Sequence, residues 1–263
     1  MLNKSINELG EKELIKKISE YMPHNQTSDD CAFLNINNAK LLINTDLMVE
    51  NTHFNKNIIS PKDLGWKAVI TTYSDLVSSG CIKSLGINIG LVMTPETKYT
   101  WIEDLYKGFS EALSEVGGSI LGGDCSKGEN IIISINAIGI QGELQLRRNA
   151  CKPGEILLTS GMHGLSKLGF LLQSNHISLN KFNLSENIKK ESIKAFCKPE
   201  SKYEVLSNII SSGKDQNIKT IGCTDSSDGF YQAIYDLSVE SNCKAIIDYQ
   251  KLPKSKFWPK GSK

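Results

Sequence analysis

The chain of 263 residues is long enough for one large domain or two of ordinary size. Hydrophobic residues make up 40% of it and charged residues 22%, which is ordinary for a globular protein. Its 30 Lys and Arg residues nearly balance its 29 Asp and Glu residues, so the net charge of +1 lacks the basic excess of an electrostatic nucleic-acid binder.

The N-terminal sequence MLNKSINELGEKELIKKI is polar, has apolar residues at helical spacing and contains no apolar core of a signal peptide. We expect a helix over Glu11 to Tyr21, ended by Met22-Pro23. No apolar run approaches the ~18 residues that a membrane span needs. We therefore expect a cytoplasmic protein that has neither a membrane nor a nucleic acid as a partner.

The chain up to residue 141 alternates between strand and helix patterns. The predicted strands are Lys40 to Asp46, Leu85 to Met93 and Ile131 to Gln141, and the predicted helices are Pro61 to Ser79 and Tyr99 to Val116. Pro61 near the first turn and Gly80 after the last turn mark the ends of the first long helix. We expect Glu155 to Thr159 (EILLT) to form a strand that pairs with Ile131 to Gln141.

The rest of the chain is predominantly helical in pattern, apart from a polar stretch that reaches Lys190. The predicted helices are Gly164 to Ser174, Tyr203 to Ser211 and Tyr231 to Glu240. Helices interspersed with β-rich runs indicate a layered α+β or mixed α/β arrangement. The turn Ala150-Cys151-Lys152-Pro153-Gly154 is the best boundary, and we expect an N-terminal domain over 1–148 and a C-terminal domain over 149–263.

Several acidic residues stand where an apolar segment ends or a helix begins. They are Asp29 and Asp30 before CAFL, Asp46 after LLINT, Asp124 after Gly122-Gly123, and Asp225 and Asp228 around Ser226-Ser227, whereas Asp75 lies inside a predicted helix. A single aspartate of this kind is most simply a helix cap. Several together favour a site for Mg²⁺, which takes carboxylate and phosphate oxygens as ligands.

Other residues leave two interpretations open. Gly122-Gly123-Asp124 is either a tight turn or a place where backbone N–H groups approach a phosphate and a carboxylate holds its metal. His53 is either a packed histidine or a substrate contact, and Tyr106 is either a core residue or a stacking partner for a base. Arg147-Arg148 is either a solvated pair or a clamp on phosphates.

Several well-known signatures are absent from the sequence. There is no G-x-x-x-x-G-K-[ST], G-x-G-x-x-G, H-E-x-x-H or G-x-S-x-G motif, so the corresponding nucleotide, zinc and hydrolase sites are not supported. The seven cysteines are scattered singly without a C-x-x-C pair, which argues against a zinc site or a disulfide framework.

The order of the motifs resembles the thiamine-monophosphate kinase family. The resemblance runs from the N-terminus to about Pro253 and rests on DDCAFL, NTDLMVENTHF, LGWKAVITTYSDL, LYKG, ILGGDCSKG, RRNACKPGEILLTSG and TDSSDGF. No single motif is specific, but their combination and order are. The resemblance implies the two-domain fold of the aminoimidazole ribonucleotide synthetase type, with the sheets of the N-terminal domains paired across a homodimer.

The resemblance also implies transfer of the γ-phosphoryl group of ATP to thiamine monophosphate, giving thiamine diphosphate. Carried over by position, the implied Mg²⁺ ligands are Asp30, Thr45, Asp46, Asp75, Asp124, Asp225 and Asp228. The implied ATP contacts are Tyr106, Gly123, Asp124, Arg148 and Ser227, and the implied thiamine contact is His53. Metal-assisted phosphoryl transfer needs no general base from the protein, and we name none.

The chain departs from the family pattern in three places. Gln26-Thr27-Ser28 replaces a G-I-G sequence, and Asn44 stands where Ser precedes Thr-Asp. The chain ends at Lys263, whereas the family continues for roughly 60 to 80 residues, so we expect its C-terminal domain to be incomplete relative to the family. Two alternatives therefore accompany the kinase: a non-catalytic dimer that binds nucleotide, and another ATP-using enzyme of the superfamily.

Overall fold

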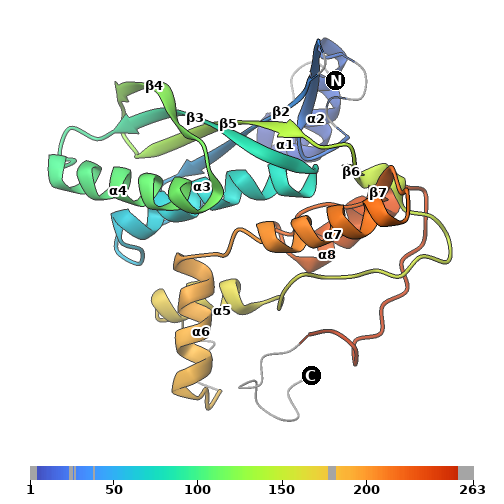
Figure 1. Cartoon of the computed structure of the whole chain (residues 1–263). Helices are drawn as coiled ribbons and strands as arrows, with labels where there is room; N and C mark the ends of the chain where they lie inside the picture. Colours follow the sequence, from blue (N-terminus) through green and yellow to red (C-terminus); the bar gives the residue numbers. More distant parts are fainter. Residues whose placement is uncertain (1–4, 24–25, 27, 38, 177–181, 254–263) are drawn as a thin grey trace.

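The computed structural model describes residues 5–23, 26, 28–37, 39–176 and 182–253 (Figure 1). Thr27, in the middle of the Gln26-Thr27-Ser28 segment, and the last residue, Lys263, lie outside these ranges. Within the ranges, no helix is long and apolar enough to cross a membrane.

The N-terminal half is built on a five-stranded sheet with the strand order β1-β2-β5-β3-β4. Its strands are β1 (Ala32–Ile36), β2 (Ala39–Val49), β3 (Cys81–Met93), β4 (Ser119–Lys127) and β5 (Ile132–Gln141). All neighbouring strands are antiparallel except β3 and β4. Helix α4 (Tyr99–Val116) joins this parallel pair, because parallel neighbours need a crossover connection.

Two long helices, α3 (Pro61–Ser78) and α4, cover one face of this sheet (Figure 1). The two helices approach closely where glycines face each other. A Cβ atom on Gly108 would lie 2.0 Å from the carbonyl oxygen of Lys62, and one on Gly65 would lie 2.2 Å from that of Leu105. Because neither glycine has a side chain, the two helices can pack in close contact, which fixes the position of α3 on the sheet.

The opposite face of the sheet carries exposed apolar side chains. Leu34 and Ile36 of β1 and Leu47 of β2 are about half exposed on that face. On β5, every second residue from Ile133 to Ala137 is buried against the helices, so Ile138 and Ile140 point to the other side. The sheet thus has one face packed against α3 and α4 and one face that these helices do not cover, which we call the open face.

Four helices are the main regular elements in the described part of the C-terminal half. They are α5 (Leu165–Gln173), α6 (Glu186–Cys197), α7 (Tyr203–Asp215) and α8 (Phe230–Glu240). Strand β6 (Gln145–Arg147) pairs in parallel with β7 (Thr220–Gly222). The short turn η2 (Arg148–Ala150) follows β6 and contacts α8. At the N-terminus lie α1 (Ile6–Leu9), α2 (Glu11–Ile18) and the turn η1 (Ser19–Tyr21).

The mixed α+β fold is confirmed, and the long helices begin and end close to the predicted residues. α4 has the predicted bounds, and α3 ends one residue earlier than predicted. The Ser60 hydroxyl caps α3 by accepting the Asp63 N–H at 3.0 Å, and Pro61 follows at the first helical position.

Two sequence-based expectations are wrong, and one of the interpretations left open is excluded. Glu155 to Thr159 lies in no strand, because β5 is already paired on both sides, with β2 and β3. Asp46 does not end its strand, since β2 continues to Val49. Gly122-Gly123-Asp124 is not a tight turn but the middle of β4. Helix α6 was not predicted at all, because its sequence ENIKKESIKAFC is largely polar.

Candidate functional site

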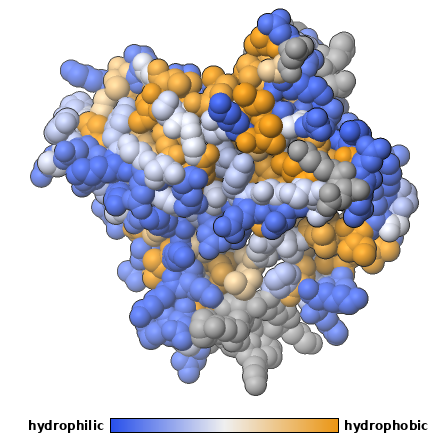
Figure 2. Space-filling view, viewed as in Figure 1, coloured by the Kyte–Doolittle hydropathy of each residue, from blue (hydrophilic) through white to orange (hydrophobic). Residues whose placement is uncertain are grey.

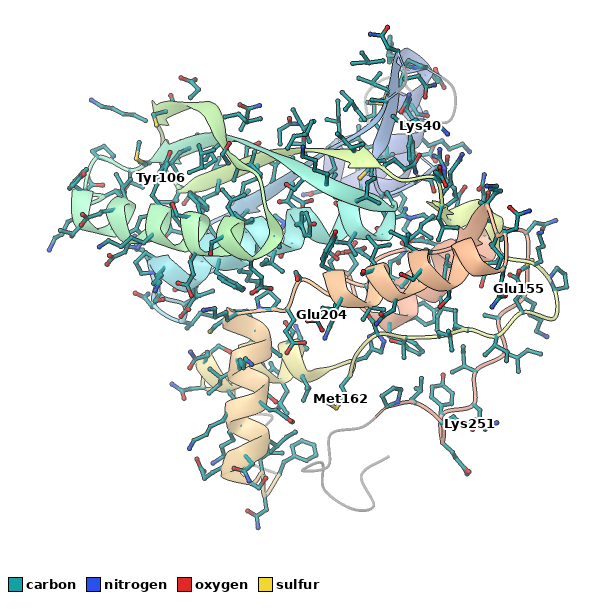
Figure 3. All side chains as sticks on the ribbon, in the orientation of Figure 1. Lys40, Tyr106, Glu155, Met162, Glu204 and Lys251 are labelled. Atoms are coloured by element: carbon teal, nitrogen blue, oxygen red, sulfur yellow. The ribbon has the colours of Figure 1, made fainter. Side chains whose placement is uncertain are left out.

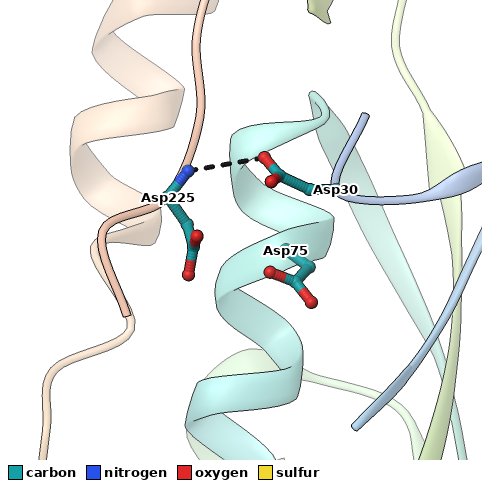
Figure 4. A group of neighbouring side chains, drawn as sticks. All are labelled: Asp30, Asp75 and Asp225. Carbon is teal, nitrogen blue, oxygen red and sulfur yellow. Dashed lines mark hydrogen bonds between the residues drawn. The ribbon is translucent and has the colours of Figure 1, made fainter. Parts of the chain in front are cut away.

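Three carboxylates from distant parts of the sequence meet at one point. Asp30 precedes β1, Asp75 lies in the last third of α3, and Asp225 follows β7. Each offers a carboxylate oxygen, and the three oxygens lie within 4.8 Å of one another (Figure 4). The group therefore joins the N-terminal sheet and its helix to the loop that leads into α8.

Hydroxyl groups on one side of α3 hold two of these carboxylates in place. Ser78 donates to Asp30 Oδ2, and Ser74 donates to Asp225 Oδ2 at 3.1 Å. The backbone N–H of Asp225 also donates to Asp30 Oδ2, at 3.4 Å (Figure 4). Ser74 and Ser78 lie one helical turn apart, and this spacing beside Asp75 was a signal in the sequence that our prediction did not use.

Burial and neighbouring negative charges both disfavour the ionised form of two of these carboxylates. Burial, followed by the charges of Asp225, Asp46 and Asp30, raises the pKa of Asp75 to about 9. Burial and then the charge of Asp30 raise the pKa of Asp225 to about 6. Both shifts mean that the charged carboxylates are destabilised in this protein. A bound cation would stabilise the charged carboxylates.

Asn44 adds an unusual oxygen to the group. Its side chain is 8% exposed, and its Nδ2 donates to Asp75 Oδ2 at 2.8 Å and to the Thr72 carbonyl at 3.1 Å. Its Oδ1 is buried and has no hydrogen-bond partner among the described residues. A buried oxygen without a donor is costly unless something electropositive meets it. The donor set, three carboxylates and a spare amide oxygen, suits a hard cation such as Mg²⁺.

Two more predicted ligands, Asp46 and Asp228, lie near each other. Burial is the largest cause of the raised pKa of Asp46, and the charge of Asp228 raises it further. The charge of Asp46 in turn contributes to the shift at Asp75. The carboxylates thus extend from β2 to the loop before α8. That loop is not a side-chain helix cap, because the N-cap of α8 is Gly229 and no side chain bonds to it.

The Thr45 and Asp124 side chains lie on the other face of the sheet. Asn44 and Asp46 face α3, so strand alternation turns Thr45 outward, where its hydroxyl accepts from Asn136 Nδ2 at 2.9 Å. Asp124 is exposed on the edge strand β4 and is level with Leu47 of β2. The strands β5 and β3 separate β2 from β4, so Asp124 lies roughly 14 Å, three inter-strand spacings, from Leu47. Thr45 is two residues further along β2 and lies still farther from Asp124.

The predicted nucleotide contacts fall into two places. Tyr106 of α4 packs edge-on against Phe109, with ring centroids 5.2 Å apart, and lies on the opposite side of the molecule from Glu155 (Figure 3). Gly123 of β4 lies so close to β3 that a Cβ would stand 1.9 Å from the Ile89 carbonyl oxygen. Arg148 and Ser227, in contrast, lie beside Asp30 and Asp225.

Arg148 is not one of a solvated pair, because its side chain is only 24% exposed and is paired within the protein. Its Nη2 donates to Asp30 Oδ1, and its Nε donates to Thr224 Oγ1 at 3.1 Å. Thr224 in turn donates to the same Asp30 oxygen at 3.1 Å. The arginine therefore places a positive charge at the edge of the carboxylate group, where phosphate oxygens would also find it.

His53 is exposed in the turn after β2. Its Nδ1 accepts the Val49 N–H at 3.1 Å. A ring nitrogen that accepts a hydrogen bond carries no proton, so in the neutral ring the proton is on Nε2. His53 thus presents an N–H donor to the solvent beside the acidic group.

The chain is similar to known proteins in sequence. Residues 28–141 match the model of the "AIR synthase related protein, N-terminal domain". The thiamine-monophosphate kinase of Prochlorococcus marinus is 38% identical over 97% of this chain and 77% of its own length. That of Synechococcus elongatus is 28% identical over 96% of this chain and 76% of its own length.

Solved structures of related proteins have the same fold as this chain. The structure described as "AaThiL complexed with AMPPCP and TMP" covers 92% of this chain and 74% of its own, with 26% identity and a TM-score of 0.79. The HypE–HypF complex matches with a TM-score of 0.62 and 17% identity over 87% of this chain and 70% of its own, which shows a shared fold alone. The chain thus spans about three quarters of the length of these relatives.

Proposed function

Since the chain belongs to the thiamine-monophosphate kinase family, we propose that it transfers the γ-phosphoryl group of ATP to thiamine monophosphate. The observation that carries the proposal is the meeting of Asp30, Asp75 and Asp225 within 4.8 Å, which gives one acidic centre to both halves of the chain. A structure of a related protein contains AMPPCP and TMP, an ATP analogue and the expected acceptor.

We propose that the acidic centre holds Mg²⁺. Asp30, Asp75 and Asp225 would form one ligand group with Asn44 Oδ1 beside it, and Asp46 and Asp228 would form a second group. When bound, the ions would neutralise the charge on the transferring phosphoryl group and on its leaving oxygen. The serines of α3 would keep the carboxylates oriented while the phosphates enter.

We propose that the remaining site residues position the two substrates. Arg148 and Ser227 would contact the phosphates of ATP next to the acidic centre. His53 would donate its Nε2 proton to an oxygen of thiamine monophosphate, because Nδ1 is occupied by the Val49 N–H. With both substrates held in line, no side chain has to act as a general base.

We propose a homodimer that pairs the open faces of two sheets. Leu34, Ile36 and Leu47 are exposed on that face, and hydrophobic residues gather over the sheet (Figure 2). Thr45 and Asp124 also face outward, yet they are separated by three strand spacings within one chain. In the dimer, Thr45 of one copy and Asp124 of the other would share a metal–nucleotide complex. Gly123 and Tyr106 would contact the nucleotide of that complex.

The dimer predicts a specific response to charge on the open face. Leu47→Lys is expected to give a monomer in sedimentation velocity, because it would bury an unpaired ammonium between two sheets. Tyr99→Lys changes a still more exposed residue on α4, away from that face, and should leave the dimer intact. A wild-type protein that sediments as a monomer at micromolar concentration contradicts the proposal.

We propose two domains, 1–148 and 149–263. All five strands of the main sheet and both covering helices precede residue 148, whereas α5 to α8 follow it. Strand β6 reaches across by pairing with β7, so the two parts would be joined at β6 and at the acidic centre.

The function predicts a metal-dependent product. Purified protein incubated with ATP, Mg²⁺ and thiamine monophosphate is expected to form thiamine diphosphate, separable by chromatography after oxidation to a fluorescent thiochrome. EDTA in excess over Mg²⁺ should abolish the product, and restored Mg²⁺ should return it. Folded protein that forms no product above background under these conditions would sink the kinase proposal.

A second candidate is binding of nucleotide without turnover. It is favoured by large apolar side chains exposed in the C-terminal half, where Ile156 and Leu158 are each 84% exposed and Ile246 is 87% exposed. In that case calorimetry would detect binding of ATP with Mg²⁺, while no thiamine diphosphate would appear in the same preparation.

A further inference from the structure

Asp29, the neighbour of Asp30, is a buried carboxylate to which neither the resemblance nor the proposed function gives a role. Its side chain is 7% exposed. Its Oδ2 accepts from Arg147 Nη1 at 3.1 Å, and its Oδ1 accepts from the backbone N–H of Arg148 at 2.8 Å. Both oxygens are therefore engaged by the two consecutive arginines at the junction of the proposed domains.

The main chain of Arg148 is held on both sides. Asp29 accepts a hydrogen bond from the Arg148 N–H. The Arg148 carbonyl oxygen accepts one from the Ser241 hydroxyl at 2.7 Å. Ser241 is the residue that follows α8, and its hydroxyl also accepts the Cys151 N–H at 3.0 Å. The backbone from which the Arg148 guanidinium extends is thus fixed from the N-terminal half by Asp29 and from the C-terminal half by Ser241.

Arg147 keeps Asp29 in that position. Its guanidinium carbon lies 3.3 Å from the centre of the Phe33 ring of β1, while its Nη1 bonds to Asp29. The ion pair is largely shielded from water, with side-chain exposures of 22% and 7%. A stacked arginine beside a shielded carboxylate has few other conformations, so Asp29 has one orientation toward the Arg148 N–H.

The consecutive arginines consequently point to different partners. Arg147, the last residue of β6, turns to Phe33 and Asp29, and Arg148 turns to Asp30 and Thr224. A change at the peptide between them would redirect the Arg148 guanidinium. Because that guanidinium already bonds to Asp30 and Thr224, the direction of its backbone decides from which side it meets a phosphate.

We propose that Asp29 is a positioning residue for nucleotide binding, acting through the backbone of Arg148. This inference rests on the proposed function, in which Arg148 contacts the phosphates of ATP. Asp29 itself touches neither the nucleotide nor the metal. It sets the orientation of the Arg148 backbone, and with it the direction in which the Arg148 side chain extends from Asp30 toward the phosphates.

The test is the dissociation constant of AMPPCP in the presence of Mg²⁺, measured by calorimetry. Asp29→Ala is expected to raise it about tenfold, because the charge-assisted bond to the Arg148 N–H is lost. Asp29→Asn retains an acceptor oxygen and should raise it about threefold, which keeps the test available if the alanine variant does not fold. The dissociation constant of thiamine monophosphate should change less than about twofold in both, which a general loss of structure would not produce.

A double-mutant cycle with Arg148→Gln shows whether Asp29 acts through Arg148. We expect Asp29→Asn to have no further effect on AMPPCP binding once Arg148 is replaced. An equal loss in both backgrounds, or no loss in the wild-type background, overturns the role of Asp29. Unchanged AMPPCP binding in Arg148→Gln alone overturns instead the nucleotide contact in the proposed function, and the inference with it.

Discussion

Replacement of Asp75 by asparagine is expected to lower kcat by about a thousandfold or more. Asp75 is central to the acidic centre, since its pKa responds to the charges of Asp225, Asp46 and Asp30. Asparagine retains the size of the side chain but removes the charge that binds the metal. Loss of several kcal/mol of metal-derived stabilisation of the transition state corresponds to a factor of this order.

Ser74→Ala is the matched control, measured in the same steady-state assay for thiamine diphosphate. Ser74 is the neighbour of Asp75 on α3 and orients Asp225 by a hydrogen bond of 3.1 Å. Removal of a group that orients a ligand costs about 10- to 100-fold in activity or metal affinity, so the serine variant should lie between wild type and Asp75→Asn. Turnover of Asp75→Asn within tenfold of wild type at saturating Mg²⁺ contradicts a ligand role.

Asp75→Asn is also expected to stabilise the metal-free protein at alkaline pH. The pKa of Asp75 is raised to about 9 in the folded chain, mainly by burial, from an ordinary value of 3.8. Between these two values the folded state binds more protons than the unfolded state. The contribution of Asp75 to the free energy of unfolding therefore falls as the pH rises from about 4 to about 9. Asparagine cannot ionise and lacks this loss.

Thermal unfolding in EDTA at pH 5 and pH 8 measures the effect. The Tm of Asp75→Asn minus that of wild type should be small at pH 5 and should reach at least about 4 °C at pH 8, since 1 kcal/mol shifts Tm by about 2 to 4 °C in a chain of this size. Saturating Mg²⁺ should reverse the order by stabilising wild type alone. A difference that does not change with pH would show that Asp75 ionises normally in the folded chain.

Local signals in the sequence predict the long helices well. Ser60-Pro61 and the glycines after Ser79 and Val116 are strong end signals, and they place α3 and α4 almost at their observed bounds. Helix α6 has a weaker pattern, with three lysine and glutamate residues and a serine between its first apolar residue, Ile188, and Ile193, and the sequence analysis does not predict it. Its stability comes from packing on α5, which only the folded chain reveals.

Strands were harder to predict because a strand exists only with a partner. Glu155 to Thr159 has the apolar composition of a buried strand, yet the described structure pairs it with nothing. Conversely, Gly122-Gly123-Asp124 has the composition of a turn but continues β4, because Gly123 can approach the β3 backbone without a side chain. Tertiary contacts decided both cases.

The aspartates of the site were named from motif order, and their grouping was not visible in the sequence. Nothing local indicates that Asp225 meets Asp30 and Asp75, or that Asp124 faces away from them. Strand alternation could have separated Thr45 from Asp46, since neighbours in a strand point to opposite faces. The spare oxygen of Asn44 and the engagement of Asp29 depend on side-chain hydrogen bonds, which only the structure supplies.

The central claim is direct transfer of the γ-phosphoryl group between two bound substrates. The most direct measurement uses ATP labelled with ³²P in the γ position, together with Mg²⁺ and thiamine monophosphate, and follows where the label goes. We predict that the label appears in thiamine diphosphate in step with the formation of ADP. Label that appears only as inorganic phosphate, or that stays in ATP while the nucleotide is bound, contradicts the account.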